Sequence, residues 1–189
     1  MTPLTSFIHS IIEITSDEVT IIEEAFDYQE ISKGELYVKQ GVIWNQIGFV
    51  LSGKLRNYYI DEKGNEITCF FVEAEHFISS FTSFLTNTPA RENIADLENT
   101  IMRFISKKDL ENLCAIVPKM QIVRRVIAEN LFIIMEKRIA MLQSQSAHER
   151  YQKMLNENPD IILSVPLQYT ASFLGITPQH LSRLRRELK

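Results

Sequence analysis

The sequence predicts an α+β protein: an N-terminal antiparallel β-domain, a long central helix and a small C-terminal helix-turn-helix domain. Three observations predict this order. Short β-rich runs separated by turn residues fill about 30–106, a long helical period without Gly or internal Pro fills about 118–144, and a helix pair ends the chain. With 189 residues, of which 45% are hydrophobic, the chain can bury one domain core and a smaller second one.

Residues 14–29 predict a short helix with Ser16 as its N-cap and acidic residues in its first turn. The β-rich runs that follow are spaced regularly, which favours a closed or sandwiched antiparallel sheet. Gly41, Gly53 and Gly64 mark its corners, and residues 61–65 predict a hairpin turn. The expected strands are 35–39, 47–52, 54–60, 66–72, 93–97 and 100–105.

Residues 118–144 predict one helix with two apolar stripes. At about 100° per residue, Ile122, Val126, Ile133 and Ala140 form the first stripe, and the second lies roughly 120° away. One stripe suffices to cover a sheet, so we expect the second to pack against another copy of this helix in a homodimer. The alternative is a helix buried within a large core. The expected dimer contacts are Met120, Val123, Ile127, Leu131, Ile134 and Met141.

The C-terminal residues predict three helices. A short amphipathic helix over 145–160 ends at Asn158, because the following residue is proline. In the helix pair that follows, Ala171 is small where two helices cross and Gly175 permits the positive φ of a turn. Leu181 and Leu184 then return the second helix to the core.

The second helix of this pair is basic and its start is well defined. Thr177 is the expected N-cap and Pro178 the first helical residue. Over 176–189, four basic residues against one acidic residue give +3, so the remainder of a chain of net charge −4 carries −7. A basic face confined to one helix indicates a DNA-binding surface, although a solvated terminal helix would also favour basic residues in its last turns. The outward residues are Gln179, His180, Ser182, Arg183, Arg185 and Arg186.

Several other classes of protein are not expected. The amino terminus lacks a basic start and a cleavage pattern, and no apolar run is long enough to span a bilayer, so we expect a cytoplasmic protein without a membrane segment. Cys69 and Cys114 are isolated and are expected to be buried free thiols. His9, His76 and His148 have no companion ligands, and no catalytic motif is present. We therefore expect no metal, no cofactor and no enzymatic activity.

Three segments carry a resemblance to a known family. They are Ile47-Gly-Phe-Val-Leu-Ser-Gly-Lys-Leu-Arg56, Asp61-Glu-Lys-Gly-Asn-Glu-Ile67 and Ala171-Ser-Phe-Leu-Gly-Ile-Thr-Pro-Gln-His-Leu-Ser-Arg183. Together with the order of the elements, they make the chain similar to the Crp/Fnr family of bacterial transcription regulators.

The resemblance implies a domain organisation and a set of contacts. Residues 1–117 would form a cyclic-nucleotide-binding-like jelly roll, 118–144 a dimerisation helix, and 145–189 a DNA-binding domain with a truncated wing. Double-stranded DNA and a second copy of the chain are the implied partners, and RNA polymerase is a further one. The implied DNA contacts are Thr177, Gln179, His180, Ser182, Arg183, Arg185 and Arg186, with Arg183 placed to bind guanine.

The implied effector pocket departs from the family pattern. Ser79 and Ser80 replace the Gly-Glu pair that binds a ribose, and Arg91 stands one position late, before a glutamate that would repel a phosphate. We therefore do not expect a cyclic nucleotide. The pocket either binds another small molecule or is a scaffold without a ligand. Its candidate residues are Phe77, Ser79, Ser80, Arg91 and Asn93.

Two functions remain open at this point. The first is a homodimeric, sequence-specific transcription regulator whose β-domain senses an effector. The second is a ligand-binding or protein-interaction module with a vestigial helix-turn-helix.

Overall fold

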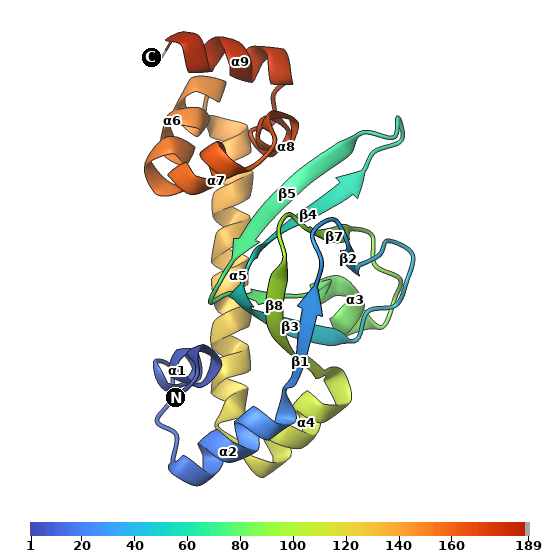
Figure 1. Cartoon of the computed structure of the whole chain (residues 1–189), viewed down its shortest axis with the longest axis vertical. Coiled ribbons are helices and arrows are strands. Elements are labelled where there is room, and N and C mark those ends of the chain that lie inside the picture. Colours follow the sequence, from blue (N-terminus) through green and yellow to red (C-terminus); the bar gives the residue numbers. More distant parts are fainter. Residues whose placement is uncertain (188–189) are drawn as a thin grey trace. The chain divides into compact units, whose positions relative to one another are not determined.

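A computed structural model describes residues 1–187 of the chain (Figure 1). It divides into two compact units. Unit 1 comprises Met1–Asn57 and Val72–Asn130, and unit 2 comprises Tyr58–Phe71 and Leu131–Lys189, of which the last two residues lie outside the described part.

Unit 1 begins with two capped helices, α1 (Pro3–His9) and α2 (Ser16–Ala25). The N-cap of α2 is Thr15, not Ser16. The Thr15 hydroxyl accepts from the Glu18 N–H at 3.3 Å, and the Glu18 carboxylate accepts from the Thr15 N–H at 2.7 Å. The capping box therefore lies one residue earlier than predicted, because only Thr15 has a glutamate three positions later.

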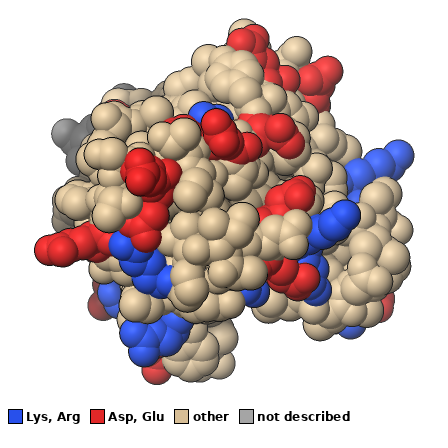
Figure 2. Space-filling model, turned by 90° about the horizontal axis from the view of Figure 1, so that it is seen from below, with Lys and Arg blue, Asp and Glu red and all other residues tan. Residues whose placement is uncertain are grey.

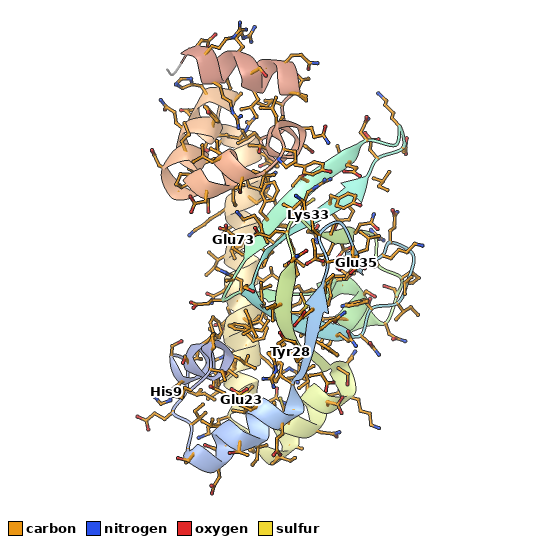
Figure 3. All side chains as sticks on the ribbon, in the orientation of Figure 1. His9, Glu23, Tyr28, Lys33, Glu35 and Glu73 are labelled. Carbon is orange, nitrogen blue, oxygen red and sulfur yellow. The ribbon has the colours of Figure 1, made fainter. Side chains whose placement is uncertain are left out.

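The helix predicted over 14–29 ends at Ala25, so its last residues were predicted wrongly. Phe26 is extended, and strand β1 (Asp27–Ile31) pairs along its length with β8 (Thr100–Ser106). Arg103 of β8 holds the end of α2: its Nη1 lies 2.9 Å from Oε2 of Glu23, labelled in Figure 3, and its Nε donates to the Phe26 carbonyl at 3.0 Å.

Two four-stranded sheets make up the β-domain, one in the order β1-β8-β3-β6 and the other in the order β2-β7-β4-β5. The predicted antiparallel jelly-roll architecture is confirmed, and all six expected strands are present. The sequence did not predict β1 or β6. The remaining strands are β2 (Leu36–Val38), β3 (Gln46–Ser52), β4 (Lys54–Ile60), β5 (Glu66–Glu73), β6 (Phe77–Ile78) and β7 (Asn93–Asp96).

The turns that join the strands use the predicted glycines. Gly53, between β3 and β4, has φ +109°, and a Cβ there would lie 2.7 Å from the Thr100 Cα. No other residue fits this position, because both the backbone conformation and the space require glycine. In the β4–β5 hairpin, Gly64 has φ +82° and the Asp61 carboxylate accepts from the Asn65 N–H at 2.8 Å. The predicted hairpin turn is therefore confirmed.

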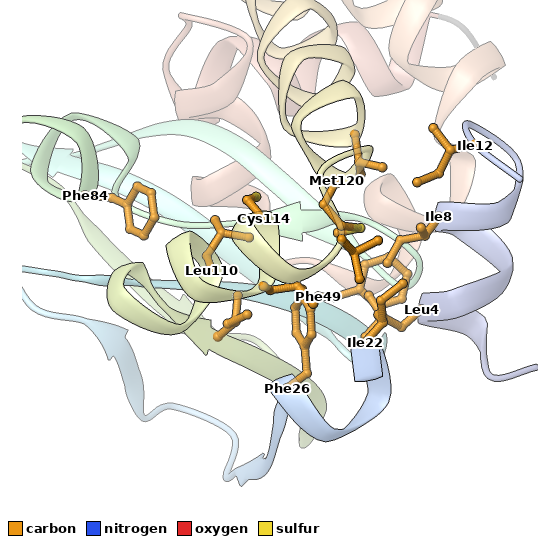
Figure 4. Close-up of a cluster of buried hydrophobic side chains, with 14 residues drawn as sticks. Leu4, Ile8, Ile12, Ile22, Phe26, Phe49, Phe84, Leu110, Cys114 and Met120 are labelled. Carbon is orange, nitrogen blue, oxygen red and sulfur yellow. The ribbon is translucent and has the colours of Figure 1, made fainter. Parts of the chain in front are cut away.

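Unit 1 contains two hydrophobic clusters. The first, shown in Figure 4, joins side chains of α1, α2, β3 and β8 to the helices α3 (Phe81–Thr86), α4 (Lys107–Ile116) and the start of α5 (Met120–Ser144). The second fills the interior of the β-domain around Val50, Leu55 and Ile94. Of the two free cysteines, Cys114 is buried as expected, whereas Cys69 on β5 is partly exposed.

The predicted dimer stripe of α5 is buried at its N-terminal end, whereas Ile134, farther along the same stripe, is 47% exposed and Leu131 and Met141 are half-buried. Met120 and Val123 are 2% and 1% exposed and belong to the first core cluster, and Ile127 packs against it. The prediction that Met120 and Val123 contact a second copy is therefore wrong, because those side chains are buried within their own chain. The exposed apolar side chains of α5 include Ile122 and Ile133 of the other stripe, together with Phe132 and Ile139.

Unit 2 contains four further helices: α6 (Ala147–Glu157), α7 (Pro159–Ser164), α8 (Leu167–Phe173) and α9 (Pro178–Glu187). The sequence did not predict α7, which starts at the proline that ends α6. The buried side chains of these helices, which include Tyr151, Ile161, Leu174 and Leu181, give unit 2 an apolar interior of its own.

Candidate nucleic-acid interface

The helix pair α8–α9 has the predicted turn. Ala171 and Leu181 are fully buried and Leu184 nearly so, and Gly175 between the helices has φ +66°. A Cβ on Gly175 would lie 3.3 Å from Cδ2 of Leu142, so space as well as conformation favours glycine there. Helices α8 and α9 therefore pack closely where they cross.

The start of α9 is the one expected. Thr177 is the N-cap, with its hydroxyl accepting from the His180 N–H at 3.2 Å and its carbonyl from the Leu181 N–H at 3.0 Å. Pro178 is the first residue of the helix. The first turn of α9 is therefore firmly defined, and its outward side chains have a fixed starting point.

All but one of the residues predicted to contact DNA have side chains that are free to face outward from the helix pair. Thr177, Gln179, Arg183 and Arg186 are exposed, and His180 and Ser182 are half-buried. Arg183 Nε lies 3.8 Å from Glu187 Oε1, an exposed pair that contributes little and leaves the guanidinium available. Arg185 differs, since its Nη2 donates to the Ile162 carbonyl of α7 at 3.0 Å. It was predicted as a DNA contact, but it holds α9 against α7.

Charge is distributed unevenly over the described residues. On the face shown in Figure 2, acidic and basic side chains are interspersed. In α9, three arginines stand against Glu187 alone. Lys189, which contributed to the predicted charge of this segment, lies outside the described residues. The uneven distribution favours a polyanion at α9.

Two arginines that the sequence did not single out hold the carbonyl end of α8. The Arg138 guanidinium of α5 stacks on the Phe173 ring, with 4.1 Å from Cζ to the ring centroid, and its Nη2 donates to the Phe173 carbonyl. Arg150 Nε of α6 donates to the Leu174 carbonyl at 2.8 Å. Burial lowers the pKa of Arg138 to about 10, so it remains a cation at neutral pH.

The β4–β5 hairpin also contacts α8. The Ser172 hydroxyl accepts from the Thr68 N–H at 2.9 Å and donates to the Glu66 carbonyl at 3.0 Å. Next to it, the rings of Phe71 and Phe173 lie 5.4 Å apart. Strand β5 is thus joined to the first helix of the pair by both polar and aromatic contacts.

The predicted effector residues do not share one environment. Phe77 packs against Phe7 and Phe49, with ring centroids 5.4 and 4.9 Å away, so it belongs to the first core cluster and was wrongly placed in a pocket. The Ser79 hydroxyl donates to the Gln46 carbonyl at 2.7 Å, and the Asn93 side chain accepts from the Gln40 N–H at 2.9 Å. Ser80 is fully buried, whereas Arg91 is exposed.

A cyclic phosphate does not suit these residues. Glu92 is buried and its carboxylate accepts from the Arg91 N–H at 3.1 Å, so a negative group already uses this backbone donor. The Arg91 side chain is exposed, and the Ser79 hydroxyl already donates a hydrogen bond to the Gln46 carbonyl. A phosphate placed here would meet a carboxylate without a converging cation.

The interior of the β-domain holds polar groups that the sequence did not single out. Tyr37 and Trp44 pack edge to face at 4.8 Å, and the Tyr37 hydroxyl and the Trp44 Nε1 are both buried. Asp96 is 1% exposed, and its carboxylate lies beside the Thr100 hydroxyl. Burial raises the pKa of Asp96 to about 6, and the charge of Glu35, labelled in Figure 3, adds to this.

Two kinds of feature are absent from residues 1–187. No described helix combines the length and apolar character needed to cross a bilayer. Within the same part of the chain, no group of three or more His, Cys, Asp or Glu is placed to hold a metal ion.

Comparison with known proteins identifies a matching domain family and several structures with a similar fold. Residues 28–116 match the family model of the cyclic nucleotide-binding domain. The solved structure of FixK2 from Bradyrhizobium japonicum is 17% identical with a TM-score of 0.73, over 86% of this chain and 84% of that one. A variant of CooA from Carboxydothermus hydrogenoformans is 18% identical with a TM-score of 0.70, over 95% and 81%. No curated protein sequence matches the chain.

A third similar structure bears on the class directly. It is a putative transcriptional regulator of the Crp/Fnr family from Eubacterium rectale, 15% identical with a TM-score of 0.71, over 93% of this chain and 83% of that one. The β-domain is therefore of the cyclic nucleotide-binding type. The chain as a whole has the fold of the Crp/Fnr transcription regulators, and the predicted resemblance is confirmed at that level.

The pKa of Asp96 predicts how the stability of unit 1 depends on pH. Because the pKa is about 6 in the folded chain and near 3.9 in an unfolded one, the fold favours the neutral acid, and ionisation destabilises it as the pH rises through 6. Asp96→Asn removes this loss. Relative to the wild type, the free energy of unfolding of Asp96→Asn should rise by up to about 3 kcal/mol between roughly pH 4 and 7, measured by urea denaturation.

Asp61→Asn provides the matched control. A hydrogen bond from the Asn65 side chain lowers the pKa of Asp61, so this substitution removes stability at neutral pH and its pH dependence has the opposite sign. A pH-independent difference between Asp96→Asn and the wild type would contradict the assigned pKa.

Proposed function

We propose that this protein is a sequence-specific, DNA-binding transcription regulator of the Crp/Fnr type. The observation that carries the proposal is the capped, exposed start of α9, with Gln179 and Arg183 facing outward beside a basic last turn. The fold of unit 1 and the similar regulator structures support it. The N-terminal part of such a helix meets base edges in the major groove.

The side chains of α9 divide by chemistry into base contacts and phosphate contacts. The exposed Arg183 guanidinium can bind guanine O6 and N7 through two hydrogen bonds, and the Gln179 amide suits adenine. His180 and Arg186 suit phosphates, since they offer donors without a specific match to one base. Arg185 is left out of this set, because its guanidinium holds the Ile162 carbonyl.

A homodimer built on the outward face of α5 would present two such helices. Phe132 and Ile139 are 70% and 56% exposed and, seven residues apart, lie on the same face of α5. Large exposed apolar side chains clustered on one helix favour an interface, and a second copy of α5 offers a complementary surface. Two α9 helices could then contact half-sites about one helical turn apart.

The input to the β-domain is not a cyclic nucleotide on this proposal. Either another small molecule binds there or the domain serves as a scaffold for the dimer. We assign no catalytic step to the chain. On this proposal the protein acts in the cytoplasm, and RNA polymerase is a further partner.

The dimer is tested by analytical ultracentrifugation. At micromolar concentration we expect the wild type to sediment as a dimer and Phe132→Glu as a monomer, because a charge on this face cannot be buried against a second copy. The matched control is Asn130→Glu, which adds the same charge at an exposed position on roughly the opposite side of α5. A wild type that remains monomeric would contradict the proposal.

Replacement of Arg183 tests whether α9 contacts bases. On its preferred site, Arg183→Ala should lose about 1–3 kcal/mol of binding free energy and discriminate less at one base pair, measured by fluorescence anisotropy on a set of single-base variants. The comparison is Arg186→Ala, which should weaken binding to all sequences alike and reduce the salt slope by about one. Equal weakening by Arg183→Ala on every sequence would remove its role in base recognition.

The same measurement separates the regulator from a module with a vestigial helix pair. The affinity of a regulator for DNA falls steeply as salt rises, because phosphate contacts release counterions. The vestigial module would give no measurable binding even in dilute salt.

A further inference from the structure

The carbonyl end of α8 lacks a cation of its own. No basic residue lies in its last turn, and the last carbonyls of a helix have no partners within the helix. Arg138 and Arg150 supply the donors, one to the Phe173 carbonyl and the other to the Leu174 carbonyl. Both arginines belong to helices that precede the pair in the chain, so α8 is tied to α5 and α6.

The Arg138 contact depends on the shape of a guanidinium. Its charge is matched by a carbonyl oxygen and the face of the Phe173 ring, and no carboxylate lies within salt-bridge distance of it among the described residues. Burial lowers its pKa, Cys69 raises it and the charge of Arg150 lowers it further. A guanidinium can contact the ring through its flat face, which an ammonium does not have.

The position of α9 follows from that of α8, because their turn is closed by backbone hydrogen bonds. The Gly175 N–H donates to the Ser172 carbonyl and the Ile176 N–H to the Ala171 carbonyl, both at 3.0 Å. A shift of Ser172 or Phe173 is therefore transmitted to the start of α9. Ser172 itself is bonded to β5, and β5 runs on into Val72 and Glu73 of unit 1.

We propose that Arg138 and Ser172 are positioning residues that fix the position of α9, the proposed recognition helix. Arg138 acts through the end of α8, and Ser172 acts through its bonds to strand β5. The inference rests on the proposed function. It adds the contacts through which strand β5 and helix α5 affect the position of α9. Neither residue contacts DNA. Each acts by fixing where α8 places α9, so a change in β5 alters the affinity for DNA without a change in any DNA contact.

The experiment compares Arg138→Gln with Lys137→Gln, an exposed residue next to it on α5 that loses the same charge. Arg138→Gln should bind the preferred DNA site about tenfold more weakly with an unchanged salt slope, since a charge-assisted hydrogen bond and a cation–π contact are lost without a phosphate contact. It should also speed amide hydrogen exchange at 174–176 in the free protein. Lys137→Gln should stay close to the wild type in both measurements.

A second variant covers the case in which Arg138→Gln does not fold. Ser172→Ala removes only the hydroxyl that joins α8 to β5 and should weaken DNA binding several-fold with the same faster exchange. Ser164→Ala is its control, because that hydroxyl bonds within α7 to the Asp160 carbonyl.

The outcomes separate this inference from the proposed function. If the wild type binds no DNA, the proposed function fails and hydrogen exchange alone decides whether Arg138 and Ser172 position α8. Exchange in both variants equal to that of their controls would overturn the inference. So would a salt slope that falls by about one in Arg138→Gln, because Arg138 would then contact a phosphate directly.

Discussion

The hold of Arg138 and Arg150 on the carbonyl end of α8 is the interaction on which the placement of the helix pair depends. The last carbonyls of a helix carry partial negative charge and need donors, and a cation supplies both a donor and a compensating charge. Unit 1 uses the same device twice. Arg103 of β8 holds the end of α2, and Lys107 Nζ donates to the Phe84 carbonyl of α3 at 2.9 Å.

In each of these cases the cation comes from a different element of the chain. This explains why the sequence did not reveal it. Local patterns identify a cap when the cap and the helix are neighbours, as with Thr177 and the first turn of α9. They cannot identify a donor that lies 35 residues away, as Arg138 does from Phe173. The same limit hid strand β1, whose residues extend only because β8 lies beside them.

The central helix illustrates what periodicity can and cannot predict. The two apolar stripes of α5 were predicted from spacing alone, and both are present. Which stripe faces the core depends on unit 1, where Met120 and Val123 fill space beside α1 and α4. The period of a helix fixes the angle between its faces but not which partner each one meets. The assignment was therefore wrong for Met120 and Val123 at the start of the helix, although the reason for expecting a partner is unchanged.

The β-domain and the helix pair also differ in how far their residues explain a function. In α9, the exposed side chains of Gln179, Arg183 and Arg186 offer donors that suit the proposed DNA contacts. In the β-domain, Asp96, Tyr37 and Glu92 are buried polar groups, and none of them has been assigned a ligand. The proposed DNA contacts can thus be named residue by residue, whereas we assign no effector to the β-domain.

Selection of bound sites from a random pool of DNA by the full chain tests the central claim most directly. The account predicts strong enrichment of an inverted repeat whose two half-sites are about one helical turn, or roughly 10 base pairs, apart. That result would establish sequence recognition and a symmetric dimer together. A pool that shows no enrichment, or that yields a single half-site without symmetry, would contradict it.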